Sequence, residues 1–416
     1  MTLDPVHFDG IAALARQVGR EVDDASHQQF AETVWEEFLD PLEVDGRRII
    51  EPIDEQYRKR VAIEDAALCA QPLPESYGID SGTINPTTYK NGVVMDVAHA
   101  AMGCVPTDLD CHRARTVIIG AHIDDDALRF SSEWVMYDEG YSRRRILNLR
   151  DIDRKRYTEA AVHALSLYLA ESEHALANAE GIESLLVMDG PLYPKGLLSW
   201  RDRAPELAAQ LDEQAPRKVV ENYARLVESF LDRGVPIAGF VKNPAAKRIT
   251  NAVSEETPAP WTDDAAMFVR LLEQREGDDR VRDELTYTNW FVSRGGTDRT
   301  FAADGDALGF ERSHPTEEYE VTFFAIYDPR DDVLYTVEAP YGVTKDEEIR
   351  EALQTQMLSE VAAQRGPPEA VAKADELARI SAREKEALRR MIEGELDSER
   401  SRTYDDVRWG GEEAFF

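Results

Sequence analysis

Two aspartates stand at the ends of strand-like segments, where their carboxylates could hold a metal ion. Asp80 lies among small residues in YGIDSG, and Asp189 lies in LLVMDGPL, where an apolar run ends in Gly190 and Pro191. Hard divalent cations prefer carboxylate oxygens, and two carboxylates close together repel each other unless a cation lies between them. Aspartate also forms turns without any metal, so each residue alone is ambiguous. Their matching placement favours one shared metal site.

A third ligand is expected on the helix that the sequence predicts from about residue 153 to residue 177. Glu159, in RKRYTEAAVHAL, lies near the start of this helix and borders its apolar face, and it is our candidate. Glu171 and Glu173, later on the same helix, stay open as alternatives. By contrast, the acidic run at residues 124–126 is typical of a solvated loop, and no two histidines have the spacing of a histidine metal motif.

The elements that must position these residues are strands and helices. Strands are expected at residues 76–84, 92–103 and 115–123, and the helix at 153–177 is followed by a strand at 184–190, a helix at 218–234 and a strand at 235–242. Three antiparallel strands followed by helix–strand units predict an α/β fold with a mixed sheet, the layout of ribonuclease H-like domains. In that layout the first and fourth strands are neighbours, which would bring Asp80 beside Asp189.

Helical extensions are predicted at both ends of this core. Apolar residues at helical spacing within residues 5–42 indicate a face that needs burial against the body of the protein, a second subunit or a partner. The four expected regions are an N-terminal helical region at 1–72, the ribonuclease H-like core with insertions at 73–345, its C-terminal helical part at 346–395, and a flexible acidic and aromatic tail at 396–416. An unrelated coiled-coil adaptor built on the terminal helices would not account for the three strand-like segments around Asp80.

The chain is strongly acidic and poor in lysine. Its 416 residues include 81 Asp and Glu against 48 Lys and Arg, a formal net charge of −33, and only 10 of the basic residues are Lys. This pattern is typical of a halophilic protein in molar salt, where the Debye length falls to ~3 Å. The alternative is an acidic protein encoded by a GC-rich genome and working at low salt. By itself the charge argues against a nucleic-acid partner, because such proteins usually carry a basic surface.

The composition also bears on location and on cysteine chemistry. No apolar run approaches the ~20 residues of a membrane span and no signal-peptide pattern opens the chain, so a soluble, cytoplasmic protein is expected. The three cysteines, Cys69, Cys104 and Cys111, include no CxxC pair. Their number and spacing exclude a disulfide framework and a thiolate zinc site.

Six segments, taken in chain order, resemble the motifs of the NurA family of archaeal and bacterial DNA-repair nucleases. YGIDSG resembles the first acidic motif of the family and LLVMDGPL the second. PIAGFVKNPAAKRI (236–249) is similar to its Gly-x-Val/Phe-Lys segment, and FERSHP (310–315) and LYTVEAP (334–340) match its late strands. GPPEAVAKADELARISAREKEALRRMI (366–392) looks like its C-terminal motif. The resemblance extends from about residue 75 to residue 393 and suggests a haloarchaeal member.

This resemblance implies a metal-dependent deoxyribonuclease that acts in the end resection of double-strand breaks, with 5′→3′ exonuclease and single-strand endonuclease activity. It implies one or two Mn²⁺ or Mg²⁺ ions, a homodimer, and partnership with the hexameric HerA translocase. By motif, the metal ligands would be Asp80, Glu159 and Asp189. Lys242 and Arg312 are our candidates for contacts with DNA phosphates.

The C-terminal motif departs from the family pattern. The family has Gly-Tyr-Pro followed by Ala-His, whereas Pro367 and Asp375 occupy the matching Tyr and His positions in this chain. Asp375 can supply an oxygen ligand but cannot act as a neutral imidazole would, and it is included among the expected catalytic residues. The departure leaves two alternatives open: a catalytically weakened subunit that docks on the translocase, and a ribonuclease H-like nuclease acting on RNA or branched DNA. DNA binding and a net charge of −33 are compatible if the acidic residues coat the outer surface and a channel keeps basic ones.

Overall fold

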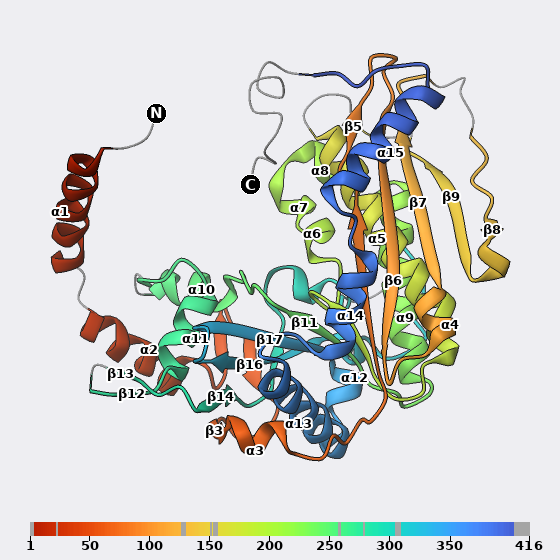
Figure 1. Cartoon of the computed structure of the whole chain (residues 1–416). Helices are drawn as coiled ribbons and strands as arrows, with labels where there is room; N and C mark the ends of the chain where they lie inside the picture. Colours follow the sequence, from red (N-terminus) through yellow and green to blue (C-terminus); the bar gives the residue numbers. More distant parts are fainter. Residues whose placement is uncertain are drawn as a thin grey trace.

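The fold is organised around one large mixed sheet with helices packed on it (Figure 1). The structure is a computed structural model that describes residues 4–21, 24–125, 130–149, 152, 157–256, 259–277, 279–303 and 309–402. Within these residues fifteen strands join the large sheet, and two more form a separate ribbon. The mixed α/β class predicted from the sequence is therefore confirmed.

The strand order places the two aspartate-bearing strands near the centre of the sheet. Along the sheet the strands are β1 (Leu42–Val44), β2 (Arg47–Pro52), β15 (Phe291–Ser293), β16 (Val321–Asp328), β17 (Val333–Pro340), β11 (Ile237–Val241), β10 (Leu186–Asp189), β4 (Ser76–Thr83), β6 (Val94–Val105), β7 (Arg115–His122), β9 (Ser142–Asn148) and β8 (Val135–Tyr137). Off this path, β14 (Glu284–Thr288) pairs with β16 and β3 (Arg58–Ala62), and β5 (Thr87–Thr88) pairs with β6. The ribbon consists of β12 (Arg275–Glu276) and β13 (Asp279–Arg280).

β4 and β10 lie side by side and run parallel, as the sequence predicts. Their last paired residues are Ile79 and Met188, so Asp80 and Asp189 each follow directly after the pairing ends. β10 is also parallel to β11, whereas β4, β6 and β7 form an antiparallel succession. The run LLVM is fully buried because it lies in the interior of the sheet with helices on both faces.

The helices that matter most for the site cover β4 from two sides. α5 (Thr158–Asn178) and α9 (Gln214–Leu231) share a hydrophobic core with one face of the sheet, and α14 (Glu369–Ala378) packs on β4 and β6 from the other. α14 lies so close that a Cβ at Gly78 would fall 2.3 Å from the backbone of Ala370. A Cβ at Gly82 would fall 2.4 Å from the carbonyl oxygen of Ala378. Glycine at both positions therefore allows the close approach of the helix.

The remaining helices lie around the rest of the sheet. They are α1 (Pro5–Glu21), α2 (Asp24–Phe38), α3 (Ile63–Ala67), α4 (Leu109–Arg113), α6 (Lys195–Leu198), α7 (Trp200–Arg203), α8 (Pro205–Gln210), α10 (Arg248–Glu256), α11 (Asp264–Leu272), α12 (Tyr341–Thr344), α13 (Glu347–Gln364) and α15 (Ala382–Glu395). The predicted helix at 218–234 agrees with α9 to within four residues, and α13, α14 and α15 lie within the predicted C-terminal helical part at 346–395. In the described part of the chain, no helix has both the length and the hydropathy to cross a membrane.

The N-terminal region is less independent than predicted. Residues 1–72 contain strands β1, β2 and β3, which join the main sheet, in addition to the expected helices. Val34 on α2 is buried against the body of the protein, whereas Phe8 on α1 is 59% exposed. α1 projects away from the body (Figure 1). The apolar residues expected to need burial are therefore exposed on α1, whereas those on α2 are packed against the body of the protein.

Two further expectations are altered by the structure. Cys104, at the end of β6, and Cys111, in α4, form a disulfide, a single local bridge in a chain for which the sequence had excluded a disulfide framework. A short connection brings these two cysteines together, and neither an odd count nor a missing CxxC pair excludes such a local bridge. Cys69 is free and exposed. Of the expected flexible tail, Arg400 is held by ion pairs to Glu386 and Glu393 on α15, and residues 403–416 lie outside the described residues.

Candidate metal centre

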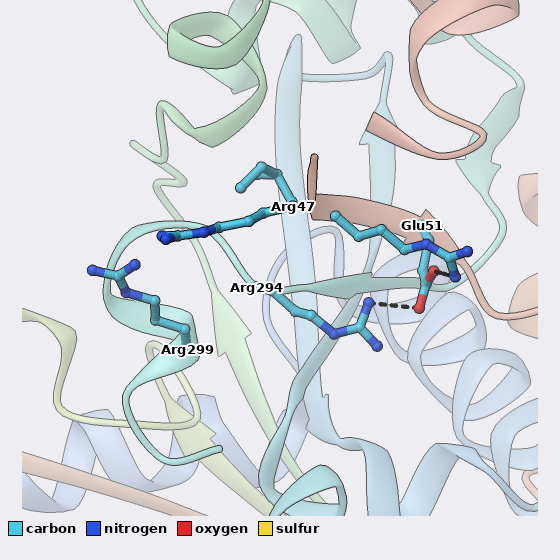
Figure 2. Close-up of a pocket in the computed structure, with 6 residues that line it drawn as sticks. Arg47, Glu51, Arg294 and Arg299 are labelled. Carbon is cyan, nitrogen blue, oxygen red and sulfur yellow. Dashed lines mark hydrogen bonds and ion pairs between the residues drawn. The ribbon is translucent and has the colours of Figure 1, made fainter. Parts of the chain in front are cut away.

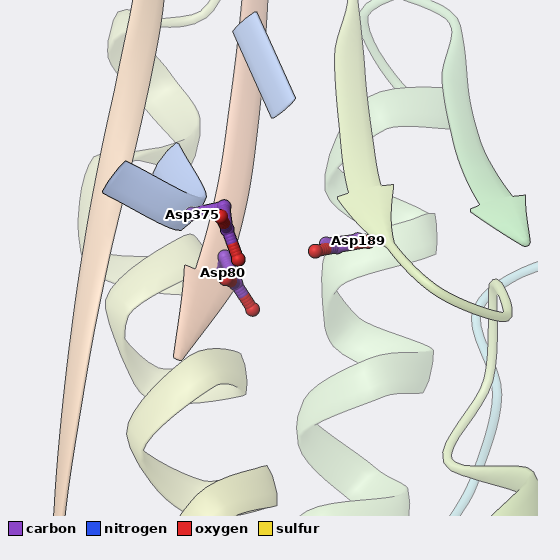
Figure 3. Close-up of side chains that lie close together, drawn as sticks. All are labelled: Asp80, Asp189 and Asp375. Carbon is purple, nitrogen blue, oxygen red and sulfur yellow. The ribbon is translucent and has the colours of Figure 1, made fainter. Parts of the chain in front are cut away.

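Three aspartates from different elements converge at the point where β4 and β10 separate. Asp80 on β4, Asp189 at the end of β10 and Asp375 on α14 each offer a carboxylate oxygen, and these atoms all lie within 4.8 Å of one another (Figure 3). The donor set consists of carboxylate oxygens, which is the set that Mg²⁺ and Mn²⁺ prefer. The structure thus brings together three of the residues that the sequence singles out.

Local backbone features hold these side chains in place. The N–H of Ser81 donates a hydrogen bond to Asp80 Oδ1 at 2.7 Å. Gly190 follows Asp189 with φ of 119°, a conformation that L-residues with a side chain rarely adopt. Its N–H donates to the carbonyl oxygen of Phe240 on β11. The chain can therefore turn sharply after β10 and leave the Asp189 carboxylate at the edge of the sheet.

α14 is fixed at its first turn as well as along its length. The N–H of Glu369 donates to Glu360 Oε2 of α13 at 3.1 Å, and Glu360 is buried. This bond satisfies one of the amide groups that a helix leaves free at its N-terminus. This hydrogen bond and the close packing over Gly78 and Gly82 fix the position of α14, and with it the position of Asp375 relative to Asp80.

Lys242 lies beside the cluster. It follows β11, the parallel neighbour of β10, and its Nζ is 2.7 Å from Asp189 Oδ2. Lys242, a candidate for a phosphate contact, therefore lies beside the three aspartates. Its ammonium group offsets part of the negative charge at Asp189.

Glu171 on α5 lies directly behind Asp80. Its Oε2 accepts a hydrogen bond from Ser81 Oγ at 3.1 Å, and its Oε1 accepts one from the Tyr223 hydroxyl at 2.9 Å. The side chain is buried. Glu171 was one of the alternatives for the third ligand on this helix, and it is the one whose pKa is raised by the charge of Asp80.

The structure does not bring Glu159 to the cluster. Glu159 is exposed in the first turn of α5 and accepts a hydrogen bond from Thr88 Oγ1 at 2.5 Å. Twelve residues separate it from Glu171, which corresponds to ~18 Å along a helix. Glu173, the other alternative, forms an ion pair with Arg145 of β9. The sequence could not separate these glutamates, because much of α5 is apolar and several of its faces are buried.

The acidic groups of this centre bind protons unusually well. Burial, together with repulsion from Asp189 and Asp375, raises the pKa of Asp80 to about 7. Burial raises the pKa of Glu171 to about 8, although hydrogen bonds from Tyr223 and Ser81 oppose the shift. Burial also raises the pKa of Asp189, against the effect of Lys242. Several partly desolvated carboxylates so close together repel one another when ionised, and a divalent cation bound between them would offset this repulsion.

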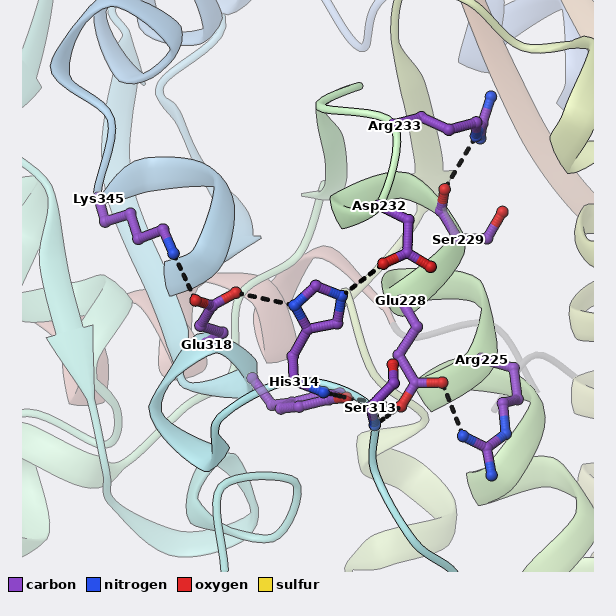
Figure 4. Close-up of polar contacts among 10 residues, drawn as sticks. Arg225, Glu228, Ser229, Asp232, Arg233, Ser313, His314, Glu318 and Lys345 are labelled. Carbon is purple, nitrogen blue, oxygen red and sulfur yellow. Dashed lines mark hydrogen bonds and ion pairs between the residues drawn. The ribbon is translucent and has the colours of Figure 1, made fainter.

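Arg312, the second candidate for a phosphate contact, is used within the fold. Its guanidinium donates to the carbonyl oxygens of Phe301 and Ala303 and lies over the ring of Tyr319. The neighbouring residues fasten this segment to α9 (Figure 4): Ser313 N–H donates to Glu228 Oε1 at 2.9 Å. The motif FERSHP therefore has a clear structural role in this chain.

Comparisons with known proteins point to one family. The model of the NurA domain family matches residues 74–380. A crystal structure of the NurA nuclease from Sulfolobus solfataricus is similar with a TM-score of 0.51 and 11% identity, covering 95% of this chain and 98% of that one. A NurA structure bound to dAMP and manganese is similar with a TM-score of 0.45 and 13% identity, covering 82% of this chain and 92% of that one. No curated protein matches significantly.

Proposed function

This chain belongs to the NurA family of nucleases, and from that premise we propose that it hydrolyses phosphodiester bonds of DNA with a divalent cation held by Asp80, Asp189 and Asp375. The observation that carries the proposal is the convergence of their oxygen atoms within 4.8 Å of one another. We further propose the finer activities of the family resemblance: 5′→3′ exonuclease and single-strand endonuclease action in the resection of double-strand breaks.

The residues present fit Mn²⁺ or Mg²⁺. Asp80, Asp189 and Asp375 would hold the ion, and Glu171 would support them from behind through Ser81 and Tyr223. When bound, such an ion lowers the pKa of a water molecule and stabilises negative charge on phosphoryl oxygens. The number of ions, one or two, is left to measurement.

Lys242 has two roles in this proposal. It pairs with Asp189. If Asp189 held a cation, the ammonium group of Lys242 would be available to a phosphate oxygen of the DNA. Lysine suits this change of partner because its charge sits at the end of a long flexible stem. Lys242 would then bind and orient the phosphodiester at the centre.

Asp375 supports a second candidate function. In the family pattern a histidine stands at its position, and a carboxylate cannot act as a neutral imidazole. A centre with this extra negative charge would bind the cation well but would lack one proton-transfer group. We therefore keep as the alternative a catalytically weakened subunit that docks on the translocase.

The partners in our proposal are a HerA-type translocase and a second copy of this chain. Phe8, Ile11, Leu14 and Val18 are 53–66% exposed on α1 and form one apolar stripe. Burial of this stripe against a partner would remove apolar surface from water. Light scattering of the chain, alone and mixed with the translocase, tests both interactions.

The test of the nuclease proposal is cleavage of labelled single-stranded DNA. Wild-type protein with Mn²⁺ is expected to release labelled fragments, and EDTA or Asp80→Asn is expected to abolish the release. Glu159→Gln is the matched control, because it removes the same kind of charge from an exposed residue outside the cluster. RNA and branched DNA in the same assay test the remaining alternative. Intact DNA with wild-type protein and Mn²⁺ would overturn the proposal.

A further inference from the structure

A second basic feature lies on β2, β15 and η3 (Gly296–Arg299). Arg47, Arg48, Arg294 and Arg299 line one surface pocket of about 450 Å³ with Ile49 and Glu51 (Figure 2). Four guanidinium groups around one carboxylate give the pocket lining a charge of +3, in a chain with a net charge of −33. We call this site the arginine pocket.

Two of the four arginines are neutralised by carboxylates. Arg294 pairs with Glu51 at 2.5 Å and with Glu320 at 2.5 Å, and Arg48 pairs with Glu51 at 2.7 Å. These ion pairs hold the side chains on one side of the pocket in place. The Arg294–Glu51 pair also joins β2 to the residue that follows β15, as does the hydrogen bond from the Arg294 N–H to the carbonyl oxygen of Ile49.

The other two arginines, Arg47 and Arg299, have no carboxylate partner among the described residues. Arg47 and Arg299 are exposed, and neither side chain has a hydrogen bond or an ion pair with any residue in the part of the chain that the structure describes. Their side chains lie on the same side of the pocket in Figure 2, away from the pair formed by Arg294 and Glu51. Like charges on one pocket repel each other unless an anion lies between them. The planar guanidinium fork matches phosphate oxygens in particular.

A second basic pocket in the same protein provides a contrast. It is lined by Arg58, Lys59 and Arg60 among other residues. There Arg58 pairs with Glu32, Arg60 pairs with Glu284, and Lys59 lies over the ring of Tyr57. The three basic residues of this second pocket thus have carboxylate or aromatic partners within the fold, in contrast to Arg47 and Arg299.

The distance from the metal centre suggests the kind of phosphate involved. β15 is four strands away from β10 in the sheet, which corresponds to roughly 19 Å at ~4.8 Å per strand. The two regions are joined through a buried ion pair, because Lys195 on α6, which follows Asp189, lies 2.7 Å from Asp298 on η3. A stacked single strand has one phosphate per ~3.4 Å, so five or six nucleotides would span the separation.

We propose that the arginine pocket binds a phosphodiester of the DNA strand whose scissile bond lies at Asp80, Asp189 and Asp375. The proposal rests on the nuclease function proposed above. Arg47 and Arg299 would bind a backbone phosphate five or more nucleotides away from the metal centre. Such contacts with phosphate do not depend on the base sequence. They would set the minimum length of a tightly bound substrate.

Fluorescence anisotropy in EDTA tests this proposal without hydrolysis. The probes are a 12-nucleotide single strand, which can reach both sites, and a trinucleotide, which cannot. Arg47→Ala/Arg299→Ala is expected to raise the Kd for the 12-mer about tenfold and to leave the trinucleotide unchanged. The slope of log Kd against log salt should fall by about 1.4, or 0.7 for each lost phosphate contact. Arg47→Lys/Arg299→Lys should keep most of the slope.

The control is Arg16→Ala/Arg282→Ala, which removes two exposed arginines from other elements and should leave both Kd values within about twofold. An unchanged 12-mer affinity and slope in the pocket variant would overturn the proposal. An equal loss for the trinucleotide, with full competition by inorganic phosphate, would also overturn it, since the pocket would then be an isolated anion site. Adding Mn²⁺ to the same samples separates the two proposals: cleavage with no effect of the pocket variant refutes the pocket alone, and pocket-dependent binding without cleavage refutes the nuclease alone.

Discussion

Ser81 Oγ donates a hydrogen bond to Glu171 Oε2 at 3.1 Å, while the N–H of the same residue donates to Asp80. One serine thus links a buried glutamate of α5 to the first aspartate of the metal centre. Successive side chains of a strand point to opposite faces, so Asp80 and Ser81 face different sides of β4. Glu171 acts on the centre from the face opposite α14.

This link predicts different outcomes for two glutamates on one helix. Glu171→Gln should weaken Mn²⁺ binding and lower the cleavage rate about 10- to 100-fold, the range typical of residues that orient metal ligands. Glu159→Gln should change either quantity by less than about threefold. Calorimetric titration with Mn²⁺ and initial cleavage rates measure both. A large effect of Glu159→Gln with none of Glu171→Gln would restore the original expectation from the sequence.

The raised pKa values predict that metal affinity depends on pH. A cation must displace the protons of Asp80 and Glu171, whose pKa values lie at about 7 and 8. Mn²⁺ affinity should therefore rise with pH from about 6 to 8 and level off above that range. Titrations at a series of pH values would show this rise, and Asp80→Asn should flatten it. A flat profile in the wild type would contradict the assigned shifts.

The same shifts predict the stability of the metal-free protein. Between the ordinary pKa values of 3.8 and 4.5 and the raised values of the folded state, the folded chain holds protons that the unfolded chain has released. These groups therefore stabilise the fold at low pH, and their contribution is lost as pH rises through about 7 and 8. In EDTA, the Tm of wild type should fall more steeply from pH 6 to pH 8 than that of Asp80→Asn. Mn²⁺ at pH 8 should recover the loss in the wild type.

The packing of α14 predicts that position 78 requires glycine. Gly78→Ala would place a Cβ 2.3 Å from backbone atoms of Ala370, so the helix must shift. We expect a loss of about 2–3 kcal/mol in the free energy of unfolding, with lower Mn²⁺ affinity because Asp375 moves with the helix. Gly181→Ala is the control, since nothing lies within 4 Å of its Cβ, and it should change stability by less than about 1 kcal/mol. Equal stability of the two variants in urea unfolding would refute the packing argument.

Lys242 is predicted to affect DNA more than metal. Lys242→Met removes the ammonium group that pairs with Asp189, and it should raise KM for single-stranded DNA about tenfold while Mn²⁺ affinity stays within about threefold. Lys218→Met, which breaks an exposed lysine–glutamate pair on α9, should leave KM unchanged. Steady-state kinetics at saturating Mn²⁺ decide the matter, and an unchanged KM in Lys242→Met would remove Lys242 from the DNA site.

The sequence was sufficient to predict Asp80 and Asp189, because the local residue pattern and the expected strand order both point to them. Apolar runs ending in small residues marked Asp80 and Asp189, and the strand order made them neighbours. It could not choose Glu171 over Glu159, because the buried surface of α5 is too broad for periodicity to rank its glutamates. It missed the arginine pocket because Arg47 and Arg299 are 252 positions apart in the sequence and meet only through the pairing of β2 with β15.

Anomalous diffraction from crystals soaked in Mn²⁺ tests the central claim most directly. We predict a manganese peak bound by carboxylate oxygens of Asp80, Asp189 and Asp375 at about 2.0–2.3 Å, with Lys242 no longer paired with Asp189. The peak should be absent from crystals of Asp80→Asn soaked in the same way. Manganese bound elsewhere, with these three carboxylates free of metal, would contradict the account.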